Sequence, residues 1–165
     1  MNDFARIKKQ QSVFRDHRVD RFILCPKHWH AFKSRAKLSW QGVKFETASA
    51  AKLPNNKRGV YTFVVQPDVG FHPSISYLLY VGMVDTSDFR TRFKSYLGET
   101  KKPKPRDHIL YMIDRWSKHM WFYYAPVSAK TNVELLEDKL LIAMLPPMNR
   151  KFPAKVRNAV RMTFS

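Results

Sequence analysis

Tyrosines stand close to glycines in two strand-like segments of this chain, Gly59-Val60-Tyr61 and Tyr80-Val81-Gly82. Further along, a cation and a carboxylate, Arg92 and Glu137, fall on faces of predicted helices that are otherwise apolar. Polar groups in such places cost free energy unless they are paired or bind a ligand. Hydroxyl groups, a fixed cation and a carboxylate together suit the hydrolysis of a phosphodiester, which needs an activated water and a stabilised phosphate charge.

Helical phase separates Arg92 from the cations around it. On the helix predicted over residues 89–97, Arg92 shares the apolar face that carries Tyr96. Arg90 and Lys94 point elsewhere on the same helix. Two interpretations of Arg92 stay open: it reaches solvent or a structural carboxylate, or it is held at the edge of the core to meet a phosphate.

Glu137 is separated from its acidic neighbours in the same way. A Thr131-x-x-Glu134 capping box predicts a helix that runs to about Leu145 and has an apolar stripe, within which Glu137 falls. Glu134 and Asp138 are better placed for solvent. A carboxylate on a core-facing stripe usually has a partner, which can be a salt bridge, a backbone donor or a metal ion.

The elements that must position these side chains follow from local patterns. Residues 59–65 and 77–84 are rich in β-branched and aromatic side chains and predict an antiparallel pair of strands, and residues 120–127 predict a third. Ser39 to Phe45 alternates around a Gln-Gly pair, which is typical of a hairpin. The fold class is therefore α/β, with a small, mainly antiparallel three-stranded sheet flanked by helices and a basic N-terminal extension.

In order and in position, these residues resemble the GIY-YIG nuclease family. That family opens with a Gly-Ile-Tyr strand and a Tyr-Ile-Gly strand, then places an Arg on the next helix, a Glu on a later helix and an Asn beyond a Pro. The matching residues here are Gly59-Val60-Tyr61, Tyr80-Val81-Gly82, Arg92, Glu137 and, after Pro147, Asn149. The segment 92–96 also resembles the Arg-x-x-x-Tyr of family members. The resemblance covers roughly residues 59–150.

By this resemblance, the catalytic set is Tyr61, Tyr80, Arg92, Tyr96, Glu137 and Asn149. Glu137 would hold one divalent cation, Mg²⁺ or Mn²⁺, and Arg92 would clamp the scissile phosphate. Tyr61 is the candidate general base, with Tyr80 and Tyr96 tuning or positioning it. Asn149 would support the site from behind or contact a phosphate. The implied activity is metal-dependent endonucleolytic cleavage of DNA, in restriction or phage defence, mobile-element cleavage or DNA repair.

The charge of the chain favours a polyanionic partner. Its 165 residues carry a net charge of +17 with a pI near 10.2, and residues 1–58 hold fourteen Lys and Arg against four Asp and Glu. We expect a basic, aromatic-rich extension that binds DNA (1–58), a nuclease domain (59–150) and a basic tail (151–165). The candidate nucleic-acid contacts are Lys57, Arg58, Arg90, Lys94, Lys101, Lys102, Lys104, Arg106, Arg150 and Lys151.

The remaining composition narrows the class of protein. A hydrophobic fraction of 44% is enough for a core, and the single cysteine, Cys25, excludes an internal disulfide and fits a reducing cytoplasm. Since no run of about 18 apolar residues occurs, no membrane partner is expected. The expected partner is double-stranded or branched DNA, bound by a monomer or a homodimer. The alternative from another class is a non-catalytic nucleic-acid-binding protein with the same basic fold.

Overall fold

A four-stranded antiparallel sheet forms the centre of the fold. The computed structural model describes residues 20–34, 37–67 and 75–164, and within them the chain is a mixed α/β protein. The strands are β1 (Gln41–Lys44), β2 (Gly59–Val65), β3 (Tyr77–Val84) and β4 (Met120–Pro126). Their order across the sheet is β1-β4-β2-β3, and every neighbouring pair is antiparallel.

The three-stranded sheet that the sequence predicts is wrong by one strand. The segment around Gln41 and Gly42 forms no hairpin; it is the single strand β1, which pairs with β4, with Gln41 opposite Tyr124. The side chains of this pair also meet, because the Tyr124 hydroxyl donates to Oε1 of Gln41 at 2.7 Å. Val43 and Phe45 then enter the core, so the sheet begins before residue 59.

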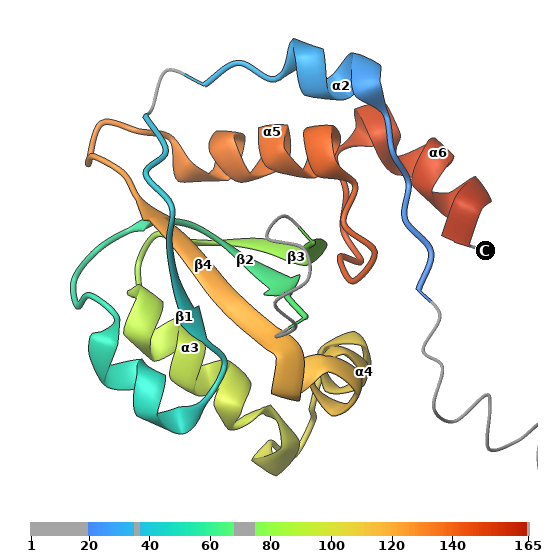
Figure 1. The fold of residues 1–165 in the computed structure, drawn as a ribbon. Helices are drawn as coiled ribbons and strands as arrows, with labels where there is room; N and C mark the ends of the chain where they lie inside the picture. The colour runs from blue at the N-terminus through green and yellow to red at the C-terminus, as the bar shows by residue number, and fades with distance from the viewer. Residues whose placement is uncertain (1–19, 35–36, 68–74, 165) are drawn as a thin grey trace, which may run out of the picture.

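Helices cover both faces of the sheet (Figure 1). On one face lies α5 (Val133–Met144), with α2 (Pro26–Ala31) against its outer side and α6 (Ala154–Phe164) near its C-terminal end. The other face carries α3 (Phe89–Leu97), α4 (Asp107–Trp116) and the 3-10 helix η1 (Thr47–Lys52). Two further 3-10 turns, η2 (Glu99–Lys101) and η3 (Ser117–His119), flank α4.

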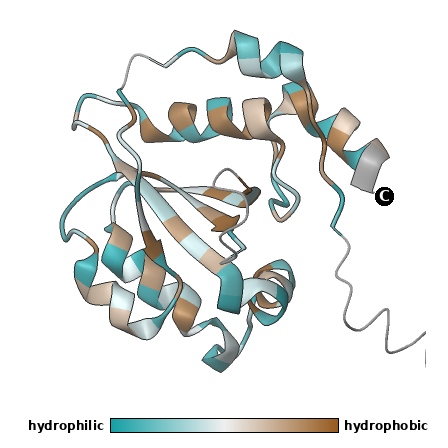
Figure 2. Ribbon diagram, viewed as in Figure 1, coloured by the Kyte–Doolittle hydropathy of each residue, from teal (hydrophilic) through white to brown (hydrophobic). Residues whose placement is uncertain are grey.

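The central position of β2 explains its sequence. Tyr61, Phe63 and Val65 point to the face covered by α3 and α4, while Val60 points to the face covered by α5. A strand buried on both faces has no polar side to alternate with, which is why Gly59–Val65 is almost continuously apolar. Figure 2 shows the result, with apolar residues along the strands and α5 and hydrophilic residues along α2 and the connecting loops.

Side-chain caps fix where the two important helices begin. Asp88 accepts a hydrogen bond from the backbone N–H of Thr91 at 2.7 Å and starts α3. At the start of α5 the cap is Asn132, which accepts from the N–H of Leu135, rather than the predicted Thr131. Leu145 ends α5 in a left-handed conformation with φ of 47°.

None of the helices in the described part of the chain is long and apolar enough to cross a membrane.

Candidate active site

A cleft of about 590 Å³ opens where α5 meets the outer strand β3. Its lining includes three members of the predicted catalytic set, Tyr80, Glu137 and Asn149. Arg106 and His108, near the start of α4, complete one side. Burial and the cations Arg150 and Arg106 lower the pKa of His108, so its imidazole is neutral at neutral pH.

The three predicted tyrosines gather directly behind this cleft. The hydroxyls of Tyr61 and Tyr96 lie 2.8 Å apart, and a side-chain hydrogen bond also couples Tyr96 to Tyr80. The ring centroids of the three lie 6.0 to 6.4 Å from one another. Tyr61 and Tyr96 are 2% and 0% exposed, whereas Tyr80 is half-buried and lines the cleft. Of the three tyrosines, Tyr80 is therefore the one whose side chain lines the cleft.

Burial keeps these hydroxyls protonated. It is the largest cause raising the pKa of Tyr61 above its usual value, and the neighbouring Tyr80 adds to it, while Arg92 acts in the opposite direction. Burial likewise raises the pKa of Tyr80 and of Tyr96. At neutral pH all three are phenols, which can donate hydrogen bonds to a phosphate or relay a proton.

Both motif glycines are explained by close packing. Gly82 lies opposite Tyr61 in the register of β2 and β3, and a Cβ on it would collide with the Tyr61 ring. Gly59 has φ of 155°, and a Cβ there would collide with the carbonyl oxygen of Ala125. The tyrosine ring and the strand pairing that holds it thus both require glycine.

Glu137 projects from α5 into the cleft with its charge uncompensated. Burial, together with Asp138, raises its pKa to about 7, against the opposing effect of Arg92. Within the described residues it has no hydrogen bond and no ion pair. A bound cation would supply the positive charge that the ionised Glu137 carboxylate lacks.

The donor set fits a magnesium-type ion. Among the described residues no group of three or more His, Cys, Asp and Glu side chains could hold a metal. Mg²⁺ needs no such cage, because it is usually bound by one or two carboxylates and keeps waters and substrate phosphates as its other ligands. Glu137, with Asp138 also lining the cleft, offers that kind of site.

Arg92 reaches the same region from α3. Its Nε is buried and has no hydrogen-bond partner among the described residues, and its charge acts on both Tyr61 and Glu137. Arg90, two residues earlier, instead donates to the carbonyls of Leu53 and Ala51. The two arginines point apart, in keeping with helical phase. Arg92 thus holds an unused donor within electrostatic range of the Glu137 carboxylate, although its side chain is not among those that line the cleft.

Asn149 braces the outer edge of β3. Its Oδ1 accepts from the N–H of Val81 at 3.0 Å, and its Nδ2 donates to the Val81 carbonyl at 2.8 Å. The N–H of Met148 also donates to the carbonyl of Leu79. These bonds occupy backbone groups that an edge strand would otherwise leave open, and they bring the following loop beside Tyr80. Of the two predicted roles, support from behind agrees with this geometry.

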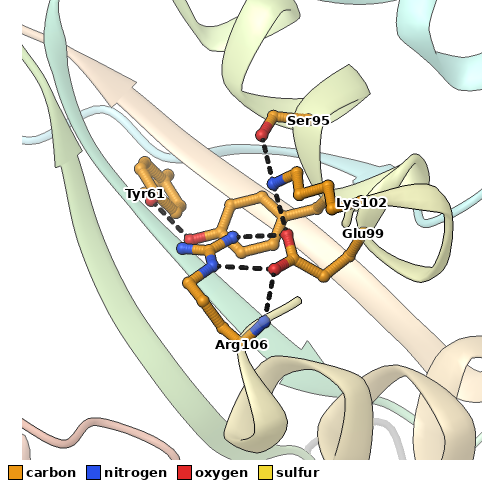
Figure 3. Close-up of polar contacts among 6 residues, drawn as sticks. Tyr61, Ser95, Glu99, Lys102 and Arg106 are labelled. Carbon is orange, nitrogen blue, oxygen red and sulfur yellow. Dashed lines mark hydrogen bonds and ion pairs between the residues drawn. The ribbon is translucent and has the colours of Figure 1, made fainter. Parts of the chain in front are cut away.

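The sequence interpretation missed a buried carboxylate, Glu99, which pairs with Arg106 and Lys102 (Figure 3). Glu99 is 0% exposed and accepts hydrogen bonds from the backbone N–H, Nε and Nη2 of Arg106 at 2.8 to 3.0 Å. Lys102 adds a fourth at 2.6 Å. The Arg106 guanidinium carbon lies 4.8 Å from the centre of the Tyr96 ring. The signal available in the sequence was that Glu99 is the one acidic residue among residues 89–106.

The predicted nucleic-acid contacts fall into two groups. Four of them are engaged within the protein: Arg58 pairs with Asp85, Arg90 binds backbone carbonyls, and Lys102 and Arg106 bind Glu99. The other six are exposed, namely Lys57, Lys94, Lys101, Lys104, Arg150 and Lys151.

The predicted N-terminal extension is described only in part, since residues 1–19 lie outside the described residues. Of its aromatic side chains, Phe45 is in the core and Phe32 packs against the α5 cluster. Phe22, Trp29 and Trp40 are exposed.

Neither a model of a known protein family, nor a curated protein, nor a solved structure matches this chain. Membership of the GIY-YIG family therefore stays a prediction from the motifs.

Proposed function

We propose that this protein is a metal-dependent endonuclease of the GIY-YIG type that hydrolyses DNA phosphodiester bonds. One observation carries the proposal: Arg92 keeps a buried, unpartnered Nε close enough to act on the uncompensated Glu137 carboxylate, beside a cleft. An anionic phosphate and a divalent cation would satisfy both groups together.

Each residue has a role that its position supports. Arg92 would bind the scissile phosphate with its planar guanidinium and stabilise the charge of the transition state. Glu137 would hold Mg²⁺ or Mn²⁺, and such an ion supplies charge neutralisation and a more acidic water when bound. In the reaction a water oxygen bonds to phosphorus, the bond from phosphorus to a sugar oxygen breaks, and the proton that the water releases is balanced by the proton that the leaving oxygen takes up.

The tyrosines would orient the attacking water or the phosphate through hydrogen bonds. The sequence predicts Tyr61 as the general base, but its 2% exposure favours a position behind the reacting atoms. We assign the direct contact with water or phosphate to Tyr80, which lines the cleft. Tyr96 joins the hydroxyls of Tyr80 and Tyr61, so the three phenols would form a hydrogen-bonded chain that orients the Tyr80 hydroxyl at the cleft.

The test is cleavage of linear, supercoiled and branched DNA with Mg²⁺ or Mn²⁺. Glu137→Gln and Arg92→Gln should each lower the cleavage rate by about 10² to 10³, the effect of removing a transition-state stabiliser, with DNA binding retained. Matched controls are Glu134→Gln on α5 and Lys52→Gln on η1, whose side chains are exposed and do not line the cleft. Equal activity in all four variants would exclude this site.

A second candidate is a non-catalytic nucleic-acid-binding protein. The net charge of +17 favours it, because binding to a polyanion needs no catalytic residue. This candidate is correct if the purified protein binds DNA tightly and cuts none of the three substrates with either metal.

A further inference from the structure

A second hollow continues the cleft along the C-terminal part of the chain. It has a volume of about 580 Å³ and reaches from Pro147 to Arg161 on α6. The two hollows share the side chains of residues 149–152 and of Arg157. They therefore form one groove that starts beside Tyr80 and Glu137 and extends along α6.

The packing of α6 turns its arginines into this groove. Val156 and Val160, four residues apart, are 1% and 7% exposed and pack into the cluster formed by α5. Arg157 and Arg161 each follow one of these valines, so they lie one above the other next to the buried face. The position of both arginines is thus set by the core.

The second hollow gathers positive charge, and none of the described residues that line it carries a carboxylate. After Asp138 the sequence contains no Asp or Glu, although it contains six Lys and Arg. Four of these line the second hollow, namely Arg150, Lys151, Arg157 and Arg161. Like charges at four-residue spacing on a helix destabilise it. Arg157 donates from Nε to the Phe152 carbonyl at 3.4 Å, which leaves the rest of its guanidinium available.

We infer that this C-terminal groove, formed by Arg150, Lys151, Phe152, Arg157 and Arg161, binds the sugar-phosphate backbone of the substrate strand on one side of the cleaved phosphate. The inference rests on the proposed nuclease function. An extended polyanion is the occupant that matches a narrow row of cations, and the groove leads directly into the cleft of Glu137. Arg157 and Arg161 are contacts that the sequence interpretation did not name.

The experiment compares two double variants of the full chain. The groove variant, Arg157→Gln/Arg161→Gln, removes two positive charges from the groove. The control variant, Lys118→Gln/Lys155→Gln, removes two positive charges from exposed positions that do not line it. Binding of a labelled DNA oligonucleotide is measured in EDTA over a series of salt concentrations. Each phosphate contact contributes about 0.7–0.9 to the slope of log K against log salt. The loss of two contacts should therefore reduce the magnitude of this slope by about 1.4–1.8 in the groove variant, and the control should change it much less.

A conservative variant separates loss of contacts from loss of folding. Arg157→Lys/Arg161→Lys keeps both charges and should retain most of the salt slope. The inference is overturned if the groove variant and its control lose affinity equally. It is also overturned if the groove variant loses affinity only for vesicles that contain phosphatidylserine and keeps its affinity for DNA.

Because binding is measured without metal, failure of the nuclease proposal can be recognised separately. A wild-type protein that never cuts DNA, combined with a groove variant that still loses the salt slope, rejects the nuclease and keeps the groove. A wild-type protein that cuts DNA, combined with two double variants that bind alike, rejects the groove and keeps the nuclease.

Discussion

At the scale of single residues, the site combines groups that the protein itself leaves unsatisfied. Arg92 keeps a free buried donor, and Glu137 keeps a carboxylate whose ionised form is disfavoured by burial. An ionisable side chain in a cleft whose pKa is strongly shifted by burial is typical of a binding or catalytic site. Tyr61 and Tyr96, by contrast, satisfy each other through a 2.8 Å contact between their hydroxyls.

The pKa of Glu137 predicts how the metal-free protein responds to pH. Its folded pKa of about 7 lies above the usual value of 4.5, so ionisation is harder in the folded protein than in the unfolded chain. The loss of folding stability that comes from ionising Glu137 is absent below pH 4.5, grows as the pH rises and is complete above about pH 7. Glu137→Gln should therefore stabilise the protein at pH 8 and change little at pH 4.

Urea unfolding in EDTA at both pH values measures this difference. The control is Asp114→Asn, an exposed carboxylate on α4, which should give the same small change at both pH values. Adding Mg²⁺ at pH 8 should stabilise the wild type and not Glu137→Gln, because the ion stabilises the ionised carboxylate. A pH-independent gain in Glu137→Gln would show that burial does not disfavour this charge.

The residues of the site could be predicted from the sequence to different extents. Helical phase separated Arg92 from Arg90, which binds backbone carbonyls, because the periodicity of a helix decides which side chains share a face. It could not show that Asn149 binds the backbone of Val81, since that contact joins residues far apart in the chain. For the same reason, a list of basic residues did not reveal that Arg106 is committed to Glu99.

At the scale of elements, the Glu99–Arg106 pair connects α3 to α4 through η2. Three of the four hydrogen bonds to the Glu99 carboxylate come from Arg106, whose backbone N–H lies at the start of α4. Its guanidinium then packs on Tyr96 of α3. The pair therefore sets the distance between the helix that carries Arg92 and the helix that carries His108.

We expect Glu99→Gln to cost about 1.5–3 kcal/mol of unfolding free energy at pH 7, because charge-assisted hydrogen bonds from Arg106 and Lys102 are lost, while these two cations are partly solvated. Hydrogen bonds from Arg106 lower the pKa of Glu99 to about 2. A lowered pKa gives stability that is complete above 4.5 and is lost as the pH falls towards 2. The difference in unfolding free energy between the wild type and Glu99→Gln should therefore be largest at pH 7 and smaller at pH 3.

Urea unfolding at pH 7 and pH 3 measures this gap, with Asp114→Asn again as the exposed control. A gap that does not narrow at pH 3 would mean that the charge of Glu99 is unimportant and that only its shape matters.

At the scale of the whole molecule, local patterns predicted the α/β class and three of the four strands. The strand that they missed, β1, has four residues, and its partner β4 follows only after two other strands and two α-helices. Alternation within Ser39–Phe45 indicated extended chain correctly, but it could not identify a distant partner. Pairing between remote segments depends on how the rest of the sheet is assembled, and no short window contains that information.

The position of β1 predicts where the chain can be shortened. A fragment of residues 59–165 would lack Val43, Phe45 and Leu53, which are 9%, 7% and 1% exposed in the core beside α3. Loss of one buried phenylalanine side chain alone costs about 3–5 kcal/mol, a large share of the 5–15 kcal/mol that stabilises a typical domain. The fragment should show no cooperative thermal transition by circular dichroism. A fragment of residues 20–165 keeps every element described and should melt cooperatively near the temperature of the full chain. If residues 59–165 melt as sharply as the longer fragment, β1 and η1 are an addition to a core that is stable without them.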